Sequence, residues 1–256
     1  MTVFGGPNFP SEANEQFKFL NEYNAIDFFI EFEGEFNFIE LLEKLIDLKF
    51  KSKLLKEQKP EISNLRYIYE DKFVQNPIRK KIRDLNSIPS PYLNNMMDKF
   101  FDDILIPVVQ TTRGCPYTCS FCWEGGEYFR KTNRFDLDRI FSEMEYIAKR
   151  SKVKDLQITD ANFGMFKDDI TTAKEILKLQ TKYDYPKTVL AATAKNHKER
   201  TVEIVEMLGD TLPATAAVQS TDKSVLENIN RGNVSLDTLM TMGKAIEKRG
   251  GQSEAE

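Results

Sequence analysis

The chain has 256 residues, of which 41% are hydrophobic and 30% are charged, so it is long and apolar enough to bury a core. Its net charge of −4 at pH 7 provides no global attraction for nucleic acid or an anionic membrane, and we expect neither as a partner. No apolar stretch approaches the roughly 20 residues that span a bilayer. The length allows one large α/β unit or two smaller domains.

The first fifty residues show strands and helices in alternation. The expected elements are a strand at Val3–Phe4, a helix capped by Ser11 and ending near Tyr23, a strand at Ala25–Ile30, and a helix after Gly34. The last helix carries an apolar stripe at i, i+3, i+4 and i+7, namely Phe38, Leu41, Leu42 and Leu45. This alternation is half of a doubly wound α/β domain, and two strands alone make a thin sheet.

Residues 51–90 are polar and basic, and Pro60, Pro77 and Pro89 interrupt any long element. We interpret them as a linker that contains one short strand near Leu65–Tyr69. The basic residues between Lys51 and Arg83 are typical of a solvated face.

From Ile104 onward, strands alternate with helices. The expected strands are 104–111, 156–159, 189–193 and 214–218, and the expected helices are 136–150, 169–182, 199–208, 223–229 and 236–248. This order predicts a parallel sheet with right-handed crossovers. In such sheets, ligands bind at the carboxyl ends of the strands.

The only three cysteines, Cys115, Cys119 and Cys122, lie in one loop after the first of these strands. Their Cys-x3-Cys-x2-Cys spacing favours a soft-metal site. An iron–sulfur cubane has four irons and usually takes four thiolates, so three thiolates leave one iron open to another ligand. Closely spaced thiols suit a reducing compartment better than a disulfide framework, so we expect a cytoplasmic protein.

Polar residues follow the other strands of this series. They are Asp160 and Asn162 after the second strand, Lys195 and Asn196 after the third, and Gln219 and Ser220 after the fourth. Because the strands are expected to be parallel, these residues and the cysteine loop should share one rim of the sheet.

The cysteine motif, with Phe121 just before its last cysteine, resembles the signature of the radical S-adenosylmethionine (SAM) superfamily. Within it, the chain is most similar to the branch with an N-terminal cobalamin-binding domain. The blocks that carry this resemblance are Gly5-Gly6-Pro7, Glu33-Gly34-Glu35, Pro89-Ser90-Pro91-Tyr92-Leu93, Arg113-Gly114-Cys115-Pro116, Asp160-x-Asn162-Phe163 and Gln219-Ser220.

The resemblance implies an α/β fold in three parts. Residues 1–50 would form the C-terminal half of a doubly wound cobalamin-binding-like domain, and residues 51–90 a linker. Residues 91–256 would form a partial (β/α) radical SAM barrel with parallel strands.

The resemblance also implies a [4Fe–4S] cluster and SAM as cofactors. Cys115, Cys119 and Cys122 would hold three irons, and the fourth iron would chelate the amino and carboxylate groups of SAM. Reductive cleavage of the sulfonium would release a 5′-deoxyadenosyl radical for chemistry on a small-molecule substrate, including cobalamin-dependent methyl transfer or cyclisation. An electron donor such as flavodoxin or ferredoxin is the expected protein partner.

Six further residues receive cofactor-binding roles from the resemblance. Phe121 would lie against the adenine, and Asp160 and Asn162 would bind the SAM amino group. Gln219 and Ser220 would approach the ribose or the methionine part. Arg231 would pair with the SAM carboxylate. The alternatives are loop packing for Phe121, helix N-capping for Asp160 and Asn162, and a surface or capping role for Arg231.

The chain departs from the branch at two points. The short Asp-x-His-x-x-Gly motif that supplies a histidine to cobalamin is absent, and the sole histidine, His197, lies beyond the third barrel strand. Cobalamin binding is therefore left open. Four barrel strands are visible where the family has six, and the last residues resemble the approach to a fifth strand that is missing.

Three other interpretations remain at this point. One is a zinc site that is completed by His197 or water, although a second Cys/His cluster is absent from the sequence. Another is a plain electron-transfer iron–sulfur protein, which would normally contain four cysteines. The third is an inactive fragment of a radical SAM enzyme whose barrel is too incomplete for turnover.

Overall fold

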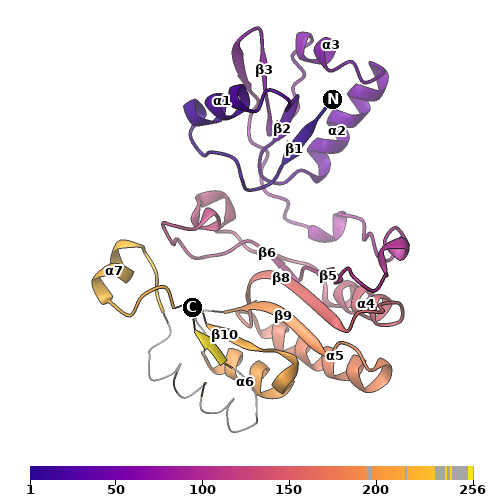
Figure 1. Ribbon diagram of the computed structural model, residues 1–256, viewed down its shortest axis with the longest axis vertical. Coiled ribbons are helices and arrows are strands. Elements are labelled where there is room, and N and C mark those ends of the chain that lie inside the picture. Colours follow the sequence, from indigo (N-terminus) through magenta and orange to yellow (C-terminus); the bar gives the residue numbers. More distant parts are fainter. Residues whose placement is uncertain (195–197, 217, 234–239, 241–242, 244–252, 256) are drawn as a thin grey trace. The chain divides into compact units, whose positions relative to one another are not determined.

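The computed structural model describes residues 1–194, 198–216, 218–233, 240, 243 and 253–255 (Figure 1). The chain divides into two units, Met1–Ile82 and Arg83–Glu256. Lys195, Asn196 and His197 lie outside the described residues, as does most of the helix expected at 236–248.

The first unit is built on a four-stranded sheet with the order β1-β2-β3-β4. Its elements are β1 (Val3–Gly5), α1 (Ala13–Glu22), β2 (Phe28–Ile30), α2 (Glu35–Asp47), α3 (Ser52–Glu57), β3 (Leu65–Tyr69) and β4 (Lys72–Gln75). The strands β1 and β2 are parallel, whereas β3 pairs antiparallel with both β2 and β4. The two expected strands and helices of residues 1–50 are therefore present, and a hairpin extends their sheet.

Within the linker predicted at residues 51–90, the short strand expected near Leu65–Tyr69 is present as β3, but residues 51–82 do not form a linker. Residues 51–82 belong to the first unit, because α3, β3 and the connection between them contribute Leu55, Ile62, Leu65 and Tyr67 to its core. These four side chains are at most 1% exposed. The polar composition of the segment concealed four well-spaced apolar residues, and their burial supplies the folding energy that a linker would lack.

The second unit contains a parallel three-stranded sheet with the order β5-β8-β9. Its strands are β5 (Val108–Val109), β6 (Thr112–Arg113), β7 (Asn133–Arg134), β8 (Asp155–Phe163), β9 (Thr188–Thr193), β10 (Ala214–Ala216) and β11 (Ser253–Ala255). Its α-helices are α4 (Leu137–Ala148), α5 (Lys167–Tyr183), α6 (Lys198–Leu208) and α7 (Lys223–Asn228). Its 3-10 helices are η1 (Leu85–Ser87), η2 (Asp98–Phe100), η3 (Trp123–Gly125), η4 (Glu127–Phe129) and η5 (Gly209–Thr211).

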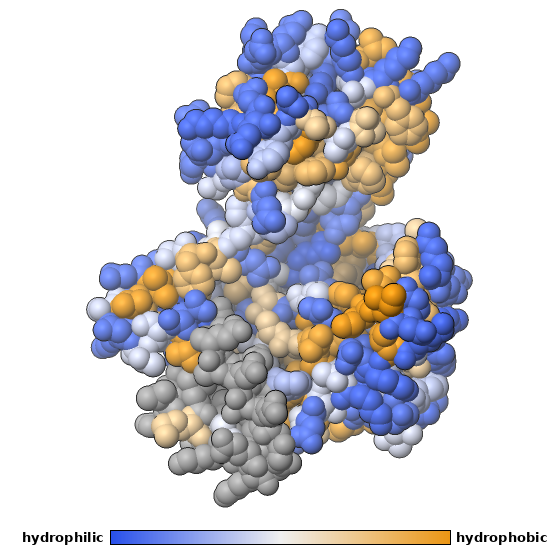
Figure 2. Space-filling view, in the orientation of Figure 1, coloured by the Kyte–Doolittle hydropathy of each residue, from blue (hydrophilic) through white to orange (hydrophobic). Residues whose placement is uncertain are grey.

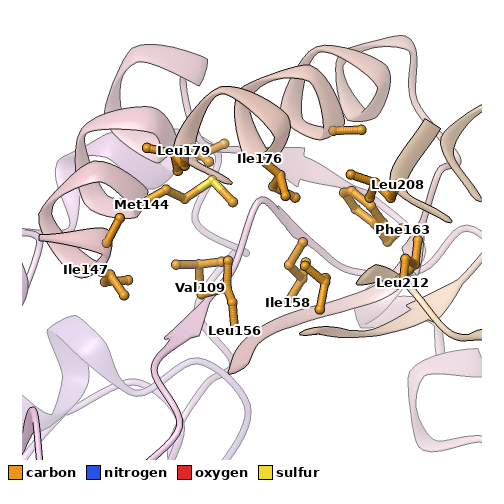
Figure 3. Close-up of a cluster of buried hydrophobic side chains, with 14 of the residues drawn as sticks. Val109, Met144, Ile147, Leu156, Ile158, Phe163, Ile176, Leu179, Leu208 and Leu212 are labelled. Atoms are coloured by element: carbon orange, nitrogen blue, oxygen red, sulfur yellow. The ribbon is translucent and has the colours of Figure 1, made fainter. Parts of the chain in front are cut away.

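The core of the second unit lies between the parallel sheet and the helices α4, α5 and α6 (Figure 3). Leu156 and Ile158 of β8 and Val109 of β5 face Met144 of α4 and Ile176 of α5. Helices packed on a parallel sheet are the layers expected of a β/α fold. One face of the sheet is thereby sealed, and the polar residues described below lie at the carboxyl ends of its strands.

The strand expected at 104–111 is shorter in the structure. Asp102 accepts hydrogen bonds from the backbone N–H groups of Ile104 (2.8 Å) and Leu105 (2.7 Å), which turns the chain before β5 begins at Val108. Ile104 is 81% exposed, and Leu105 and Ile106 are also partly open to solvent. Figure 2 shows apolar side chains at the surface near β5. The apolar run 104–107 resembles a strand in sequence, but the turn that Asp102 stabilises keeps it out of the sheet.

A fifth parallel strand, unlike the prediction, is present in the described residues. The strand β11 pairs parallel with β10 through Ser253, Glu254 and Ala255. The strand β10 in turn lies beside β9.

Among the described residues, no helix is long and apolar enough to cross a membrane.

Candidate cluster and cofactor site

The cysteine loop is closed at its base by the antiparallel pair β6–β7, in which Thr112 opposes Arg134 and Arg113 opposes Asn133. Gly114, at φ +103°, takes a left-handed conformation that a side chain would strain. The backbone N–H of Cys115 then donates to the carbonyl of Phe129 at 3.0 Å. The first cysteine is thereby held against the far end of its own loop.

The turn that carries Cys119 and Cys122 requires a glycine at position 125. The Cys122 N–H donates to the Cys119 carbonyl at 3.1 Å, and the Gly125 N–H donates to the Cys122 carbonyl at 2.9 Å. A Cβ built on Gly125 would lie 2.2 Å from the Cys119 carbonyl oxygen. Because backbone atoms cannot yield as a flexible side chain does, only glycine permits this turn.

The three thiols are free and differ in exposure. Cys115 and Cys119 are buried, at 6% and 4% exposure, whereas Cys122 is half-buried. In the part of the chain that the structure describes, no three His, Cys, Asp or Glu side chains converge on a single metal ion. A cubane does not need such convergence, since each thiolate binds a different iron. Three soft thiolates in one constrained loop fit a cluster by their chemistry.

Asn162 contacts this loop from β8. Its Nδ2 donates to the Sγ of Cys115 at 3.2 Å, and both residues are buried. Its Oδ1 is buried and has no hydrogen-bond partner. A buried carbonyl without a donor costs about 1–3 kcal/mol, so this oxygen favours a ligand that brings an N–H group. The expected position of Asn162 beside the cluster is therefore supported by geometry.

The stretch of β8 that carries Asn162 contains a register shift. Ile158 pairs with Ala191 and Phe163 pairs with Thr193, so five steps along β8 match two along β9. Ile158 and Phe163 both belong to the core, although strict alternation would place them on opposite faces. The irregularity leaves Asn162 on the face opposite its core neighbour Phe163.

Asp160 holds the segment that leads into the cysteine loop. Its Oδ1 accepts from the backbone N–H groups of Thr111 (2.7 Å) and Thr112 (3.0 Å), and its Oδ2 accepts from the Thr111 hydroxyl. Burial raises the pKa of this carboxyl, and the three hydrogen bonds oppose that rise. The structure gives Asp160 a positioning role; its contact with the SAM amino group stays a prediction.

Phe121 and Arg231 meet across two distant segments. The guanidinium carbon of Arg231 lies 5.9 Å from the ring centroid of Phe121, and the Ser120 N–H donates to the Ile229 carbonyl at 3.0 Å. The Phe121 ring is 52% exposed, whereas Arg231 is 6% exposed. An exposed ring beside a buried cation suits a face that stacks on a ligand. The surface role considered for Arg231 is excluded by its burial.

Gln219 and Ser220 belong to a loop that Asn233 ties together. The Nδ2 of Asn233 donates to the carbonyls of Val218 (2.6 Å) and Ser220 (2.9 Å), and its Oδ1 accepts from the Nε of Arg231 at 2.8 Å. Gln219 is exposed and has a left-handed backbone with φ of +63°. The structure thus brings Phe121, Ser220 and Arg231 into one region through a residue that the sequence analysis did not select.

Sequence reasoning missed several residues that build the site. Thr111, Gly125 and Asn233 act through backbone hydrogen bonds or close backbone approach. Arg134 of β7 is another, because it donates to Asp169 of α5 at 2.7 Å and so ties the base of the loop to the helix. The glycine could have been found as a turn signal directly after the cysteine motif. The others carry no local pattern.

The Radical SAM superfamily model matches residues 109–252, which is more than half of the chain. The chain belongs to the radical SAM superfamily. Members of this superfamily use a [4Fe–4S] cluster and SAM, so the predicted class of cofactors is confirmed at the level of the family.

Two curated relatives of this radical SAM chain are methyltransferases. It is 32% identical over 252 residues to the cobalamin-dependent radical SAM methyltransferase TokK of Streptomyces tokunonensis. It is also 32% identical over 247 residues to the 2-(S-pantetheinyl)-carbapenam-3-carboxylate methyltransferase of Streptantibioticus cattleyicolor. Each alignment covers 93% of this chain and 34% of the relative, so the chain spans about a third of their length.

Solved structures share the fold of this radical SAM chain. The radical SAM methyltransferase TsrM from Kitasatospora setae matches with a TM-score of 0.67 at 16% identity, over 99% of this chain and 48% of that one. The cobalamin-dependent radical enzyme OxsB matches with a TM-score of 0.62 at 17% identity, over 99% and 35%. These likenesses confirm the predicted α/β class with its parallel sheet.

Proposed function

We propose that this chain holds a [4Fe–4S] cluster through Cys115, Cys119 and Cys122 and cleaves SAM reductively to start radical chemistry on a small molecule. The observation that carries the proposal is the constrained loop that presents three free thiols beside the buried amide of Asn162. When bound, the reduced cluster supplies the electron that breaks the sulfonium carbon–sulfur bond of SAM. The protein's part is to orient SAM and to exclude water.

In this proposal, the residues around the loop contact different parts of SAM. The unpartnered Oδ1 of Asn162 accepts from the SAM amino group, and Arg231 faces its carboxylate. The exposed ring of Phe121 stacks on the adenine. Gln219 and Ser220 lie on the Asn233-tied loop toward the ribose or the methionine part. Asp160 holds the segment before the cysteine loop against β8 and approaches the SAM amino group from that strand.

We infer methyl transfer as the reaction class, with cobalamin as a further cofactor. The support is the 32% identity to two methyltransferases, one of which is named as cobalamin-dependent. In this assignment the unit Met1–Ile82 is the cobalamin-binding-like part and the unit from Arg83 onward is the radical SAM core. Retention of about one hydroxocobalamin per chain after desalting would support this part. Its complete loss would overturn the cobalamin part and leave the SAM part standing.

The proposed partners follow from the same chemistry. Reduction of the cluster needs a one-electron donor of low potential, such as flavodoxin or ferredoxin. Three free thiols require a reducing compartment, so we place the protein in the cytoplasm. The net charge of −4 supports a small-molecule substrate in place of nucleic acid or a membrane surface.

The decisive experiment is anaerobic reconstitution followed by EPR spectroscopy of the reduced protein. We expect about four irons and four sulfides per chain and a change of the EPR spectrum when SAM is added. Stoichiometric zinc without iron, or a spectrum indifferent to SAM, would reject the proposal. An EPR change without multiple-turnover formation of 5′-deoxyadenosine would identify the inactive fragment as the better interpretation.

A further inference from the structure

Asn162 donates a hydrogen bond to the sulfur of Cys115, one of the three thiols of the predicted cluster. The donor is a neutral side-chain amide on β8, and the acceptor is a buried thiol 47 positions earlier in the chain. No local sequence pattern predicts this contact. Asn162 lies in the stretch of β8, between Ile158 and Phe163, where the register against β9 shifts.

The amide nitrogen is the donor in this hydrogen bond and the Cys115 sulfur is its acceptor. The amide oxygen is buried without any partner. The reversed amide would set a carbonyl oxygen against sulfur and leave an N–H group buried in the oxygen's place. An amide N–H that points at sulfur is a donor to the thiolate in any state in which that thiolate carries charge.

We propose that Asn162 is a positioning residue that raises the reduction potential of the cluster through Cys115. This inference rests on the proposed function, because it requires the cluster. One-electron reduction adds a negative charge that spreads over the thiolate sulfurs, so an N–H donor stabilises the reduced form more than the oxidised form. Hydrogen bonds to sulfur are one of the known determinants of cluster potential. Burial of both partners strengthens the effect, since the local dielectric is low.

The first test replaces Asn162 with leucine, which has a similar size and no donor. We expect reconstituted Asn162→Leu to hold wild-type iron and to show a more negative midpoint potential in a dye-mediated titration followed by EPR. The matched control is Thr159→Val, which removes a β8 side-chain hydrogen bond to the Val109 carbonyl and leaves the Asn162–Cys115 contact in place. An unchanged potential in Asn162→Leu, or an equal shift in Thr159→Val, would overturn the inference.

The second test works on the unaltered sequence, so it holds even if Asn162→Leu fails to take up iron. Protein labelled with ¹⁵N only at asparagine side chains is reconstituted, reduced without SAM, and studied by hyperfine spectroscopy (HYSCORE). We expect a weak ¹⁵N coupling to the cluster. A reduced cluster without this coupling would overturn the role of Asn162 alone, whereas absence of any cluster would overturn the proposed function itself.

Discussion

The guanidinium of Arg231 is buried against the half-exposed ring of Phe121, with 5.9 Å between the guanidinium carbon and the ring centroid. Asn233 orients the same guanidinium by accepting from its Nε at 2.8 Å. The side chain is therefore held in place by a ring and an amide before any ligand arrives. Preorganisation of this kind lowers the entropic cost of binding.

Replacement of Arg231 by glutamine should weaken SAM binding without loss of the cluster. A hydrogen bond to a charged group contributes about 1.5–3 kcal/mol, so we expect SAM affinity to fall roughly 10- to 100-fold. The measurement is a SAM titration of the reduced, reconstituted protein by EPR. Arg83→Gln, at an exposed position, is the control and should bind SAM like the wild type. An Arg231→Gln protein with unaltered affinity would remove Arg231 from the SAM site.

Replacement of Cys119 by serine should abolish the cluster, because a hydroxyl is a poor substitute for a thiolate at iron. We expect both the cluster's EPR signal and its response to SAM to disappear. Iron and sulfide analysis after reconstitution, together with EPR, checks this outcome. A full complement of iron in Cys119→Ser would show that the cysteine loop does not hold the metal.

Gly125→Ala should displace the turn between Cys119 and Cys122. The added Cβ would lie 2.2 Å from the Cys119 carbonyl oxygen, and overpacking of this kind costs about 1–3 kcal/mol. We expect lower iron incorporation with the secondary structure retained, as judged by circular dichroism. Gly232→Ala is the matched control, since a Cβ there meets nothing within 4 Å. Equal iron contents in the two variants would show that the turn tolerates the methyl group.

Asp160→Asn should change how stability depends on pH. The folded-state pKa of Asp160 is raised above 3.8 by burial, so the folded protein binds a proton more tightly than the unfolded chain does. The contribution of Asp160 to stability is therefore present at low pH and is lost as pH rises from about 4 through the folded pKa. Asparagine cannot titrate, and it can keep the oxygen contacts to both backbone N–H groups while its amide donates to the Thr111 hydroxyl.

Urea unfolding of the apoprotein measures this effect through Trp123, the only tryptophan in the chain. The stability of Asp160→Asn relative to the wild type should rise with pH above about 4 and then become constant above the folded pKa. A difference that is independent of pH would show that the carboxyl keeps its ordinary pKa in the folded protein.

The order of elements in the second unit was predictable because each strand and helix carries its own apolar period. The helices α4, α5 and α6 begin and end within two residues of the expected bounds. The cysteine loop was equally accessible, since its three cysteines lie within eight residues of sequence. Local patterns therefore predicted the alternation of strands and helices and placed the three cysteines in one loop.

The contacts that shape the site were not predictable, because they join residues that are distant in sequence. Asn162 and Cys115 are 47 positions apart, and the irregularity of β8 has no signature in Asp160-Ala161-Asn162. The strand at Leu65–Tyr69 was predicted, but its pairing with β4 was not, because the few apolar residues of this segment are embedded in polar sequence. In each case tertiary packing decided what local propensity left open.

Because the three thiols differ in burial, their rates of alkylation in the apoprotein report whether the cysteine loop is folded. A slow alkylating reagent should modify the half-buried Cys122 first and reach Cys115 and Cys119 only when the loop opens. The ratio of singly to fully alkylated protein, read by mass spectrometry, then reports how often the empty loop opens. A preparation can thus be judged fit for cluster assembly before any iron is added.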